Sequence, residues 1–176
     1  MRSVCLLLCS ILTLPAVSCA ASTDHLSDAA KRARIQEMYD GYRASFVEVQ
    51  GISAEEVMRR RDTEDVLFID VRSAKERRIS RIRNSVTPEE LPKDPTELRE
   101  ELGDRLVVAY CTVGYRSGKY AEKLQNQGIE ILNLEGSLLS WTHAGGELVD
   151  DAGPTDKLHV YGKRWNLAPQ GIETTW

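Results

Sequence analysis

A cysteine and an arginine lie close together in the segment Cys111-Thr112-Val113-Gly114-Tyr115-Arg116. A thiolate is a strong nucleophile, but an ordinary cysteine, with a pKa of about 8.5, is mostly protonated at neutral pH. Backbone N–H groups of residues 112–117 that curl around the thiol, together with one guanidinium, would stabilise its charged form. A pKa two units lower needs about 2.7 kcal/mol of such stabilisation. Gly114 permits the curl, so the segment predicts a reactive thiolate at Cys111, with Arg116 beside it to bind an anionic substrate.

A second polar group, Asp70-Val71-Arg72, follows an apolar run. We expect Asp70 to accept hydrogen bonds from loop amides, and Arg72 to pair with Glu76 or another acid. These residues would then support the site without reacting.

The remaining polar candidates have simpler interpretations. Ser117 is expected to cap the helix that follows the cysteine segment, although a hydroxyl there is also suited to hydrogen-bonding a sulfur atom. His25, His143 and His159 are scattered and lack metal-ligand spacing, so we expect surface or ordinary hydrogen-bonding roles for them. Neither a metal nor an organic cofactor is expected.

Strands and helices must bring these residues together. Apolar, β-branched-rich runs predict buried strands at residues 66–71, 106–110 and 129–134, and a shorter strand at 46–49. Apolar spacing and capping signals predict helices, at residues 28–42, 53–60, 73–79, 96–102, 117–127 and 137–143. Alternating strands and helices predict an α/β fold with a central, mainly parallel sheet, whose carboxyl ends gather the reactive groups.

Several motifs occur in a specific order, namely Phe68-Ile69-Asp70-Val71-Arg72 with Glu76, Cys111 to Arg116 followed by Ser117-Gly118, Leu134-Glu135-Gly136-Ser137, and Trp141 with Gly145-Gly146. Together they resemble the rhodanese (sulfurtransferase) family over roughly residues 44–150. The resemblance implies a rhodanese-like three-layer fold, with helices flanking the sheet. It also implies that Cys111 carries a sulfane sulfur as a persulfide, from a donor such as thiosulfate to a nucleophilic acceptor. Substrate contacts would come from Thr112, Val113, Gly114, Tyr115, Arg116 and Ser117, with Asp70, Arg72 and Glu76 in support.

Two departures from the family bear on the substrate. Residues 80–85 replace the usual Gly-His-Ile-Pro-Gly-Ala-like sequence, and Thr112 stands where thiosulfate-using members often have a basic residue. The donor and acceptor therefore stay open, with cyanide, a small thiol and a protein thiol as candidate acceptors.

Alternative functions differ in loop length or in catalysis. Cysteine phosphatases and related arsenate reductases place one more residue between the Cys and the Arg, so the narrower loop here favours a sulfur atom over phosphate. A non-catalytic rhodanese-like module that binds a partner or senses sulfur is the other candidate function.

The N-terminus has the pattern of a signal peptide, residues 1–20. Arg2 precedes an apolar run, and small residues follow it up to a cleavage site after Ala20. The prediction is an exported protein, periplasmic or secreted. Lipid attachment at Cys19, which would tie the protein to a membrane, and an uncleaved anchor are the alternatives. Cleavage would remove every cysteine except Cys111, so no intramolecular disulfide would form.

The rest of the chain of 176 residues divides around the motifs. We expect an N-terminal helical extension at 21–43, a rhodanese-like domain at 44–150 and a C-terminal extension at 151–176. The C-terminal extension carries Val160, Tyr161, Trp165 and Trp176, so it is expected to pack across the sheet or near the mouth of the cysteine loop. The formal net charge of −4 and the lack of a basic stripe argue against a nucleic-acid partner.

Overall fold

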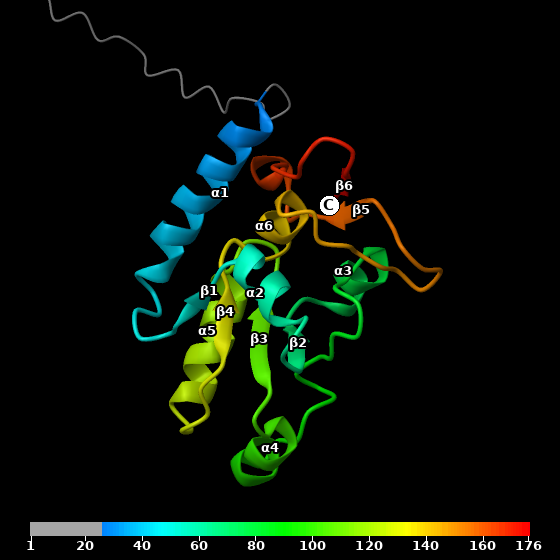
Figure 1. The fold of residues 1–176 in the computed structure, drawn as a ribbon. Helices are drawn as coiled ribbons and strands as arrows, with labels where there is room; N and C mark the ends of the chain where they lie inside the picture. Colours follow the sequence, from blue (N-terminus) through cyan, green and yellow to red (C-terminus); the bar gives the residue numbers. More distant parts are fainter. Residues whose placement is uncertain (1–25) are drawn as a thin grey trace, which may run out of the picture.

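The computed structural model describes residues 26–176 (Figure 1). The predicted signal peptide at 1–20, the lipid-attachment alternative at Cys19, and His25 lie outside the described residues. Within residues 26–176, no helix combines the length and apolar character that a membrane span requires.

Helices and strands alternate along most of the described chain. The helices and strands are α1 Asp28–Arg43, β1 Gly51–Ile52, α2 Ala54–Arg60, β2 Val66–Asp70, α3 Ala74–Ile79, α4 Pro95–Leu102, β3 Leu106–Tyr110, α5 Tyr115–Gln125, β4 Leu132–Leu134, α6 Ser137–His143, β5 Lys157–His159, the short 3-10 helix η2 Lys163–Trp165, and β6 Glu173–Thr175. This order confirms the predicted α/β class.

Among residues 26–176, the central sheet has four parallel strands in the order β1-β4-β3-β2. Phe68 of β2 pairs with Val108 of β3, and Val108 pairs in turn with Leu132 of β4. Because the strands are parallel, their carboxyl ends meet at one edge of the sheet. That edge receives the segment that follows β3, which begins at Cys111.

Both faces of the sheet are buried. In β3, Val107 and Ala109 pack in a cluster with α4 and α5, whereas Val108 and Tyr110 pack in a second cluster with α2 and α6. Successive strand residues point to opposite faces, so a strand covered on both sides is apolar throughout. The layers are therefore helices, parallel sheet and helices, as expected.

The two flanking segments pack on this core. In α1, Ile35 and Tyr39 are each 1% exposed, and the helix contacts α5 and α6. In the C-terminal segment, residues 151–176, Leu158 and Val160 are fully buried in the same cluster as α6. The Lys31 ammonium donates to the Ala168 carbonyl at 2.8 Å, which joins the two segments directly. The predicted packing of the C-terminal segment is thus observed.

Some predicted boundaries are wrong. Residues 46–49 form turns instead of a strand, with Phe46 N–H bonded to Arg43 C=O and Val49 N–H bonded to Phe46 C=O. The Phe46 and Val49 side chains are buried there. The apolar run therefore marks residues that pack in the core and does not mark a strand. The predicted strand 129–134 is reduced to β4. The predicted helix 117–127 is shifted to Tyr115–Gln125.

Candidate active site

Cys111 lies directly after β3 and is 2% exposed. Its sulfur accepts a hydrogen bond from the Gly114 N–H at 3.2 Å. The Ser117 hydroxyl donates to the same sulfur at 3.6 Å, and the Ser137 hydroxyl oxygen lies 3.9 Å from it. The Gly114 N–H, which belongs to the segment expected to curl around the thiol, and the Ser117 hydroxyl both favour a negative charge on the sulfur.

Gly114 fixes the curvature of this segment, which we call the Cys111 loop (residues 111–116). It has φ +105°, a conformation that side chains other than glycine's rarely adopt. A Cβ at this position would lie 2.6 Å from the Tyr39 ring. The Gly114 carbonyl accepts from the Asn133 side-chain amide at 2.9 Å, which anchors the loop to β4. The turn aims the Gly114 N–H at the thiol.

The pKa of Cys111 results from opposing effects. Burial raises the pKa, but the Arg116 charge and hydrogen bonds from Ser117 and Gly114 outweigh burial, so the pKa lies below its ordinary value. A lowered pKa increases the thiolate population at neutral pH.

The position of Ser117 corrects one prediction. Helix α5 begins at Tyr115, and its N-cap is Gly114, which makes no side-chain cap. Ser117 lies inside the helix, fully buried, with its hydroxyl toward the Cys111 sulfur. The left-handed Gly114 lets the helix start earlier than the predicted serine cap. The alternative contact with sulfur is the one that the structure contains.

Arg116 is bound by a carboxylate on α3. Its guanidinium donates to Glu76 Oε1 at 2.6 Å and to Oε2 at 2.9 Å, and also to the Thr112 hydroxyl at 3.3 Å. Burial raises the pKa of Glu76, but hydrogen bonds from Arg116 and Ser73 lower it more, to about 2. The arginine charge is thus compensated at short range.

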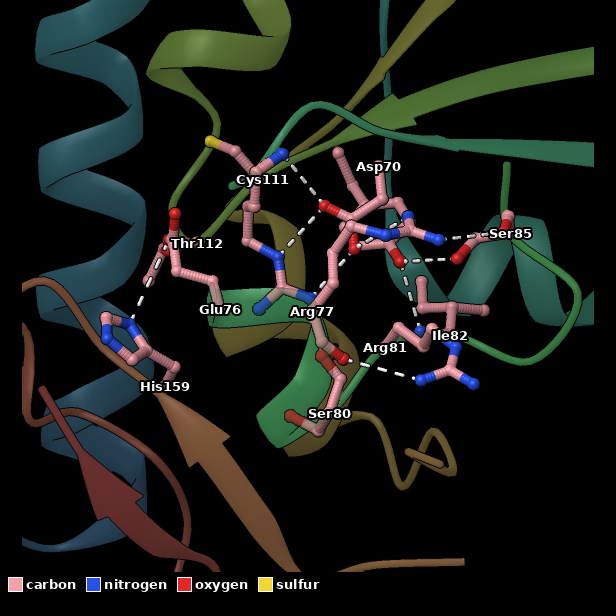
Figure 2. Close-up of polar contacts among 12 residues, drawn as sticks. Asp70, Glu76, Arg77, Ser80, Arg81, Ile82, Ser85, Cys111, Thr112 and His159 are labelled. Atoms are coloured by element: carbon pink, nitrogen blue, oxygen red, sulfur yellow. Dashed lines mark hydrogen bonds and ion pairs between the residues drawn. The ribbon is translucent and has the colours of Figure 1, made fainter. Parts of the chain in front are cut away.

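Asp70, which is labelled in Figure 2, forms a separate buried pair with Arg72. Asp70 Oδ1 accepts from both the Arg72 backbone N–H and its Nε at 3.0 Å, and Oδ2 accepts from Nη2 at 2.8 Å. Arg72 also donates to the Ser80 carbonyl at 2.6 Å. Arg72 therefore pairs with Asp70. Of the two partners expected from the sequence, Glu76 or another acid, the structure contains the second. The pair joins the end of β2 to the end of α3 and does not line the thiol.

Sequence reasoning assigned no role in the site to two polar residues, Ser137 beside the thiol and His159 beside Glu76. The Ser137 hydroxyl accepts from the Cys111 N–H at 3.0 Å and donates to the Leu134 carbonyl at 3.2 Å. His159 of β5 places Nδ1 3.9 Å from Glu76 Oε1 (Figure 2). Burial lowers the pKa of His159, although Glu76 opposes that effect. The position of Ser137 directly after the glycine of Leu134-Glu135-Gly136-Ser137 could have identified it as a site residue. The residues around His159 contain no comparable motif.

A cavity of about 320 Å³ opens onto the thiol. Cys111, Thr112, Val113 and Arg116 line it from the loop side, and aromatic side chains from α1, α5 and the C-terminal segment complete its walls. In residues 26–176, no group of three or more His, Cys, Asp or Glu side chains is arranged to hold a metal ion. The site can therefore offer a substrate one activated thiol, hydrogen-bond donors and an apolar wall.

Comparisons with known proteins agree with this geometry. The family model described as Rhodanese-like domain matches residues 53–144. A sulfurtransferase of Allochromatium vinosum is 35% identical over 111 residues, which are 60% of this chain and 99% of that protein. A tRNA uridine(34) hydroxylase of Corynebacterium kroppenstedtii is 31% identical over 111 residues, which are 59% of this chain and 36% of that protein.

A solved structure shows the same fold. The crystal structure of thiosulfate sulfurtransferase from Pseudomonas aeruginosa superimposes with a TM-score of 0.50 and 23% identity, covering 66% of this chain and 23% of that chain. At this identity the likeness concerns the fold alone.

Proposed function

The chain belongs to the rhodanese-like domain family, and from this premise we propose that it is a sulfurtransferase that carries a sulfane sulfur as a persulfide on Cys111. The observation that carries the proposal is the thiol itself, which has a lowered pKa, faces a cavity and accepts hydrogen bonds from the Gly114 N–H and the Ser117 hydroxyl. The similarity to a curated sulfurtransferase supports the same chemistry.

The reaction has two displacements on sulfur. The Cys111 thiolate attacks the outer sulfur of a donor, an S–S bond forms, and the donor's own bond to that sulfur breaks so that its electron pair leaves with the remaining group. With thiosulfate, the leaving group is sulfite. An acceptor nucleophile then attacks the outer persulfide sulfur and returns Cys111 as a thiolate. No general base is needed, because the attacking and leaving groups are already anions.

The loop donors stabilise both forms of the cysteine. The Gly114 N–H and the Ser117 hydroxyl hydrogen-bond the thiolate in the resting protein. We expect the same groups to bind the inner sulfur of the persulfide, while the outer sulfur extends into the cavity. Fixed donors of this kind need little reorganisation during the reaction.

The test is formation and discharge of the persulfide. The purified protein is incubated with thiosulfate or with inorganic polysulfide, and intact-mass spectrometry follows the gain of one sulfur atom; cyanide or a small thiol is then added. We expect the added sulfur to disappear as thiocyanate or a low-molecular-weight persulfide forms. Cys111→Ser should abolish both steps. Absence of persulfide with every sulfane donor would instead favour the non-catalytic module.

We also propose export, through the signal peptide predicted at residues 1–20. The support is the sequence pattern alone, and mass spectrometry of the mature N-terminus tests it. A mature chain that begins at Ala21 fits ordinary cleavage, and a diacylated Cys19 fits the lipoprotein alternative.

A further inference from the structure

The walls of the thiol cavity are aromatic. Tyr42 of α1 and Tyr115 of α5 form one ring pair, with centroids 5.4 Å apart, and Tyr161 and Trp165 of the C-terminal segment form another at 5.7 Å. All of these side chains line the cavity that contains Cys111. A substrate that occupies this cavity therefore lies beside aromatic rings as well as beside the thiol.

We call these four side chains, from Tyr42, Tyr115, Tyr161 and Trp165, the aromatic rim. Two of them are much more exposed than the aromatic residues of the core. Tyr115 is 44% exposed and Tyr161 is 62% exposed, whereas the core aromatics Tyr39 and Trp141 are each 1% exposed. An apolar surface left open to water beside a reactive group is available to bind an apolar ligand. The rim therefore has surface to offer to a substrate without unpacking the core.

The charge in the cavity does not suit a small dianion. Of the described residues that line the cavity, Arg116 is the cationic one. Both of its terminal nitrogens bond to Glu76, and its guanidinium lies 5.3 Å from the centre of the Tyr161 ring. A dianion such as thiosulfate would meet an arginine already paired with a carboxylate, so its attraction to the site is weakened.

We propose that the thiol cavity selects organic sulfane-sulfur donors that carry an aromatic or similarly apolar group, in preference to inorganic thiosulfate. This inference rests on the proposed function, since it names the substrate class of the same site. The apolar group lies between Tyr115 and Tyr161, and the reacting sulfur points to Cys111. The cavity volume of about 320 Å³ accommodates one ring and its sulfur-bearing group.

Aryl thiosulfonates are suitable probes, because the reacting group stays constant while the substituent changes. The Cys111 thiolate attacks the terminal sulfur of R–SO₂–S⁻, the bond between the two sulfur atoms breaks, and its electron pair leaves on the sulfinate R–SO₂⁻. The products are the Cys111 persulfide and the sulfinate, so atoms and electrons balance without an external oxidant or reductant. Benzenethiosulfonate and methanethiosulfonate have the same charge and differ in the ring.

The experiment measures the second-order rate constant for persulfide formation with each probe. Each rate is divided by that probe's rate with 2-mercaptoethanol in solution, which removes differences in intrinsic reactivity. We expect the normalised ratio of benzene to methane probe to be about tenfold or more, the effect of one apolar group in a pocket. Tyr161→Ala and Tyr115→Ala should each reduce that ratio at least about threefold, whereas Tyr161→Phe, which keeps the ring, should retain it.

Trp176→Ala is the matched control, because Trp176 is an exposed aromatic residue of the C-terminal segment that does not line the cavity. It should leave the ratio unchanged. A normalised ratio near one in the native protein, or a high ratio that both tyrosine variants retain, would overturn the inference while leaving the persulfide chemistry intact. Failure of both probes and of polysulfide to modify Cys111 would overturn the proposed function as well, which makes the two failures distinguishable.

Discussion

Arg116 and Glu76 form a two-point ion pair, with nitrogen–oxygen distances of 2.6 and 2.9 Å, beside the thiol of Cys111. The pair joins the first turn of α5 to α3, elements that are separate in the sequence. It places a positive charge near the sulfur and at the same time neutralises that charge toward an incoming anion. The pair therefore stabilises the nucleophile more than it attracts an anionic substrate.

The first prediction concerns acid stability. The pKa of Glu76 is lowered to about 2 from 4.5, so its carboxylate stabilises the fold fully above about pH 4.5, and that contribution is lost as the pH falls toward about 2. Glu76→Gln should cost about 2 to 3 kcal/mol of unfolding free energy at pH 7, allowing for some solvent screening, and this deficit should shrink through the same pH window. Urea unfolding at pH 7, 4 and 3 measures the deficit.

Glu147→Gln is the control for that experiment, because Glu147 pairs with Arg83 on the surface, where both side chains are about half exposed. An exposed pair contributes less than about 1 kcal/mol. A deficit for Glu76→Gln that is equally small, or that is constant between pH 7 and 3, would contradict the role assigned to the Glu76–Arg116 pair.

The second prediction concerns the thiol. Arg116 is the principal group that lowers the pKa of Cys111 against the effect of burial. Arg116→Met should therefore raise that pKa by about one unit, since removal of a nearby opposite charge disfavours the thiolate. The pH dependence of alkylation by iodoacetamide reports the pKa directly. Arg83→Met removes an exposed arginine and should leave the profile unchanged; superimposable profiles for the two variants would refute the assignment.

Much of the site follows from local sequence. Residues 106–116 combine an apolar run, a cysteine and a glycine, so a buried strand and a curved loop are predictable from neighbouring residues alone. The Gly114 N–H and the Cys111 sulfur are three positions apart, so the curvature of this short segment alone brings them into contact. A contact of this kind is predictable from the sequence.

Contacts between distant positions were not predictable in the same way. Arg116 and Glu76 are 40 positions apart, and Cys111 and Ser137 are 26 positions apart. These contacts depend on strand order and on the angle at which helices cross the sheet, which a single sequence does not encode locally. The aromatic rim has the same origin, because Tyr42 and Tyr161 approach the thiol from opposite ends of the chain.

The third prediction tests the curvature of the Cys111 loop. Gly114→Ala should destabilise the protein by about 3 kcal/mol or more, because the new methyl group meets the buried Tyr39 ring in addition to the backbone strain at φ +105°. Gly145→Ala is the matched control: Gly145 has φ +83° and nothing within 4 Å of an added Cβ, so it reports strain alone, about 1 to 2 kcal/mol. Equal losses of unfolding free energy for the two variants, measured by urea unfolding, would show that contact with the Tyr39 ring adds no cost at position 114.

The fourth prediction asks whether the C-terminal segment belongs to the folding unit. Leu158 of β5 is fully buried in the cluster that includes α6, so Leu158→Ala should cost about 2 to 5 kcal/mol. Leu26→Ala, at a leucine that is 39% exposed, should cost much less.

Urea unfolding followed by both Trp fluorescence and far-UV circular dichroism distinguishes a C-terminal segment that folds with the domain from one that folds independently. If the segment folds with the domain, the two signals shift together to lower urea, since the whole core loses stability. If Leu158→Ala leaves the far-UV transition in place, residues 151–176 are an independent attachment, and the rings that Tyr161 and Trp165 contribute to the thiol cavity are held only loosely.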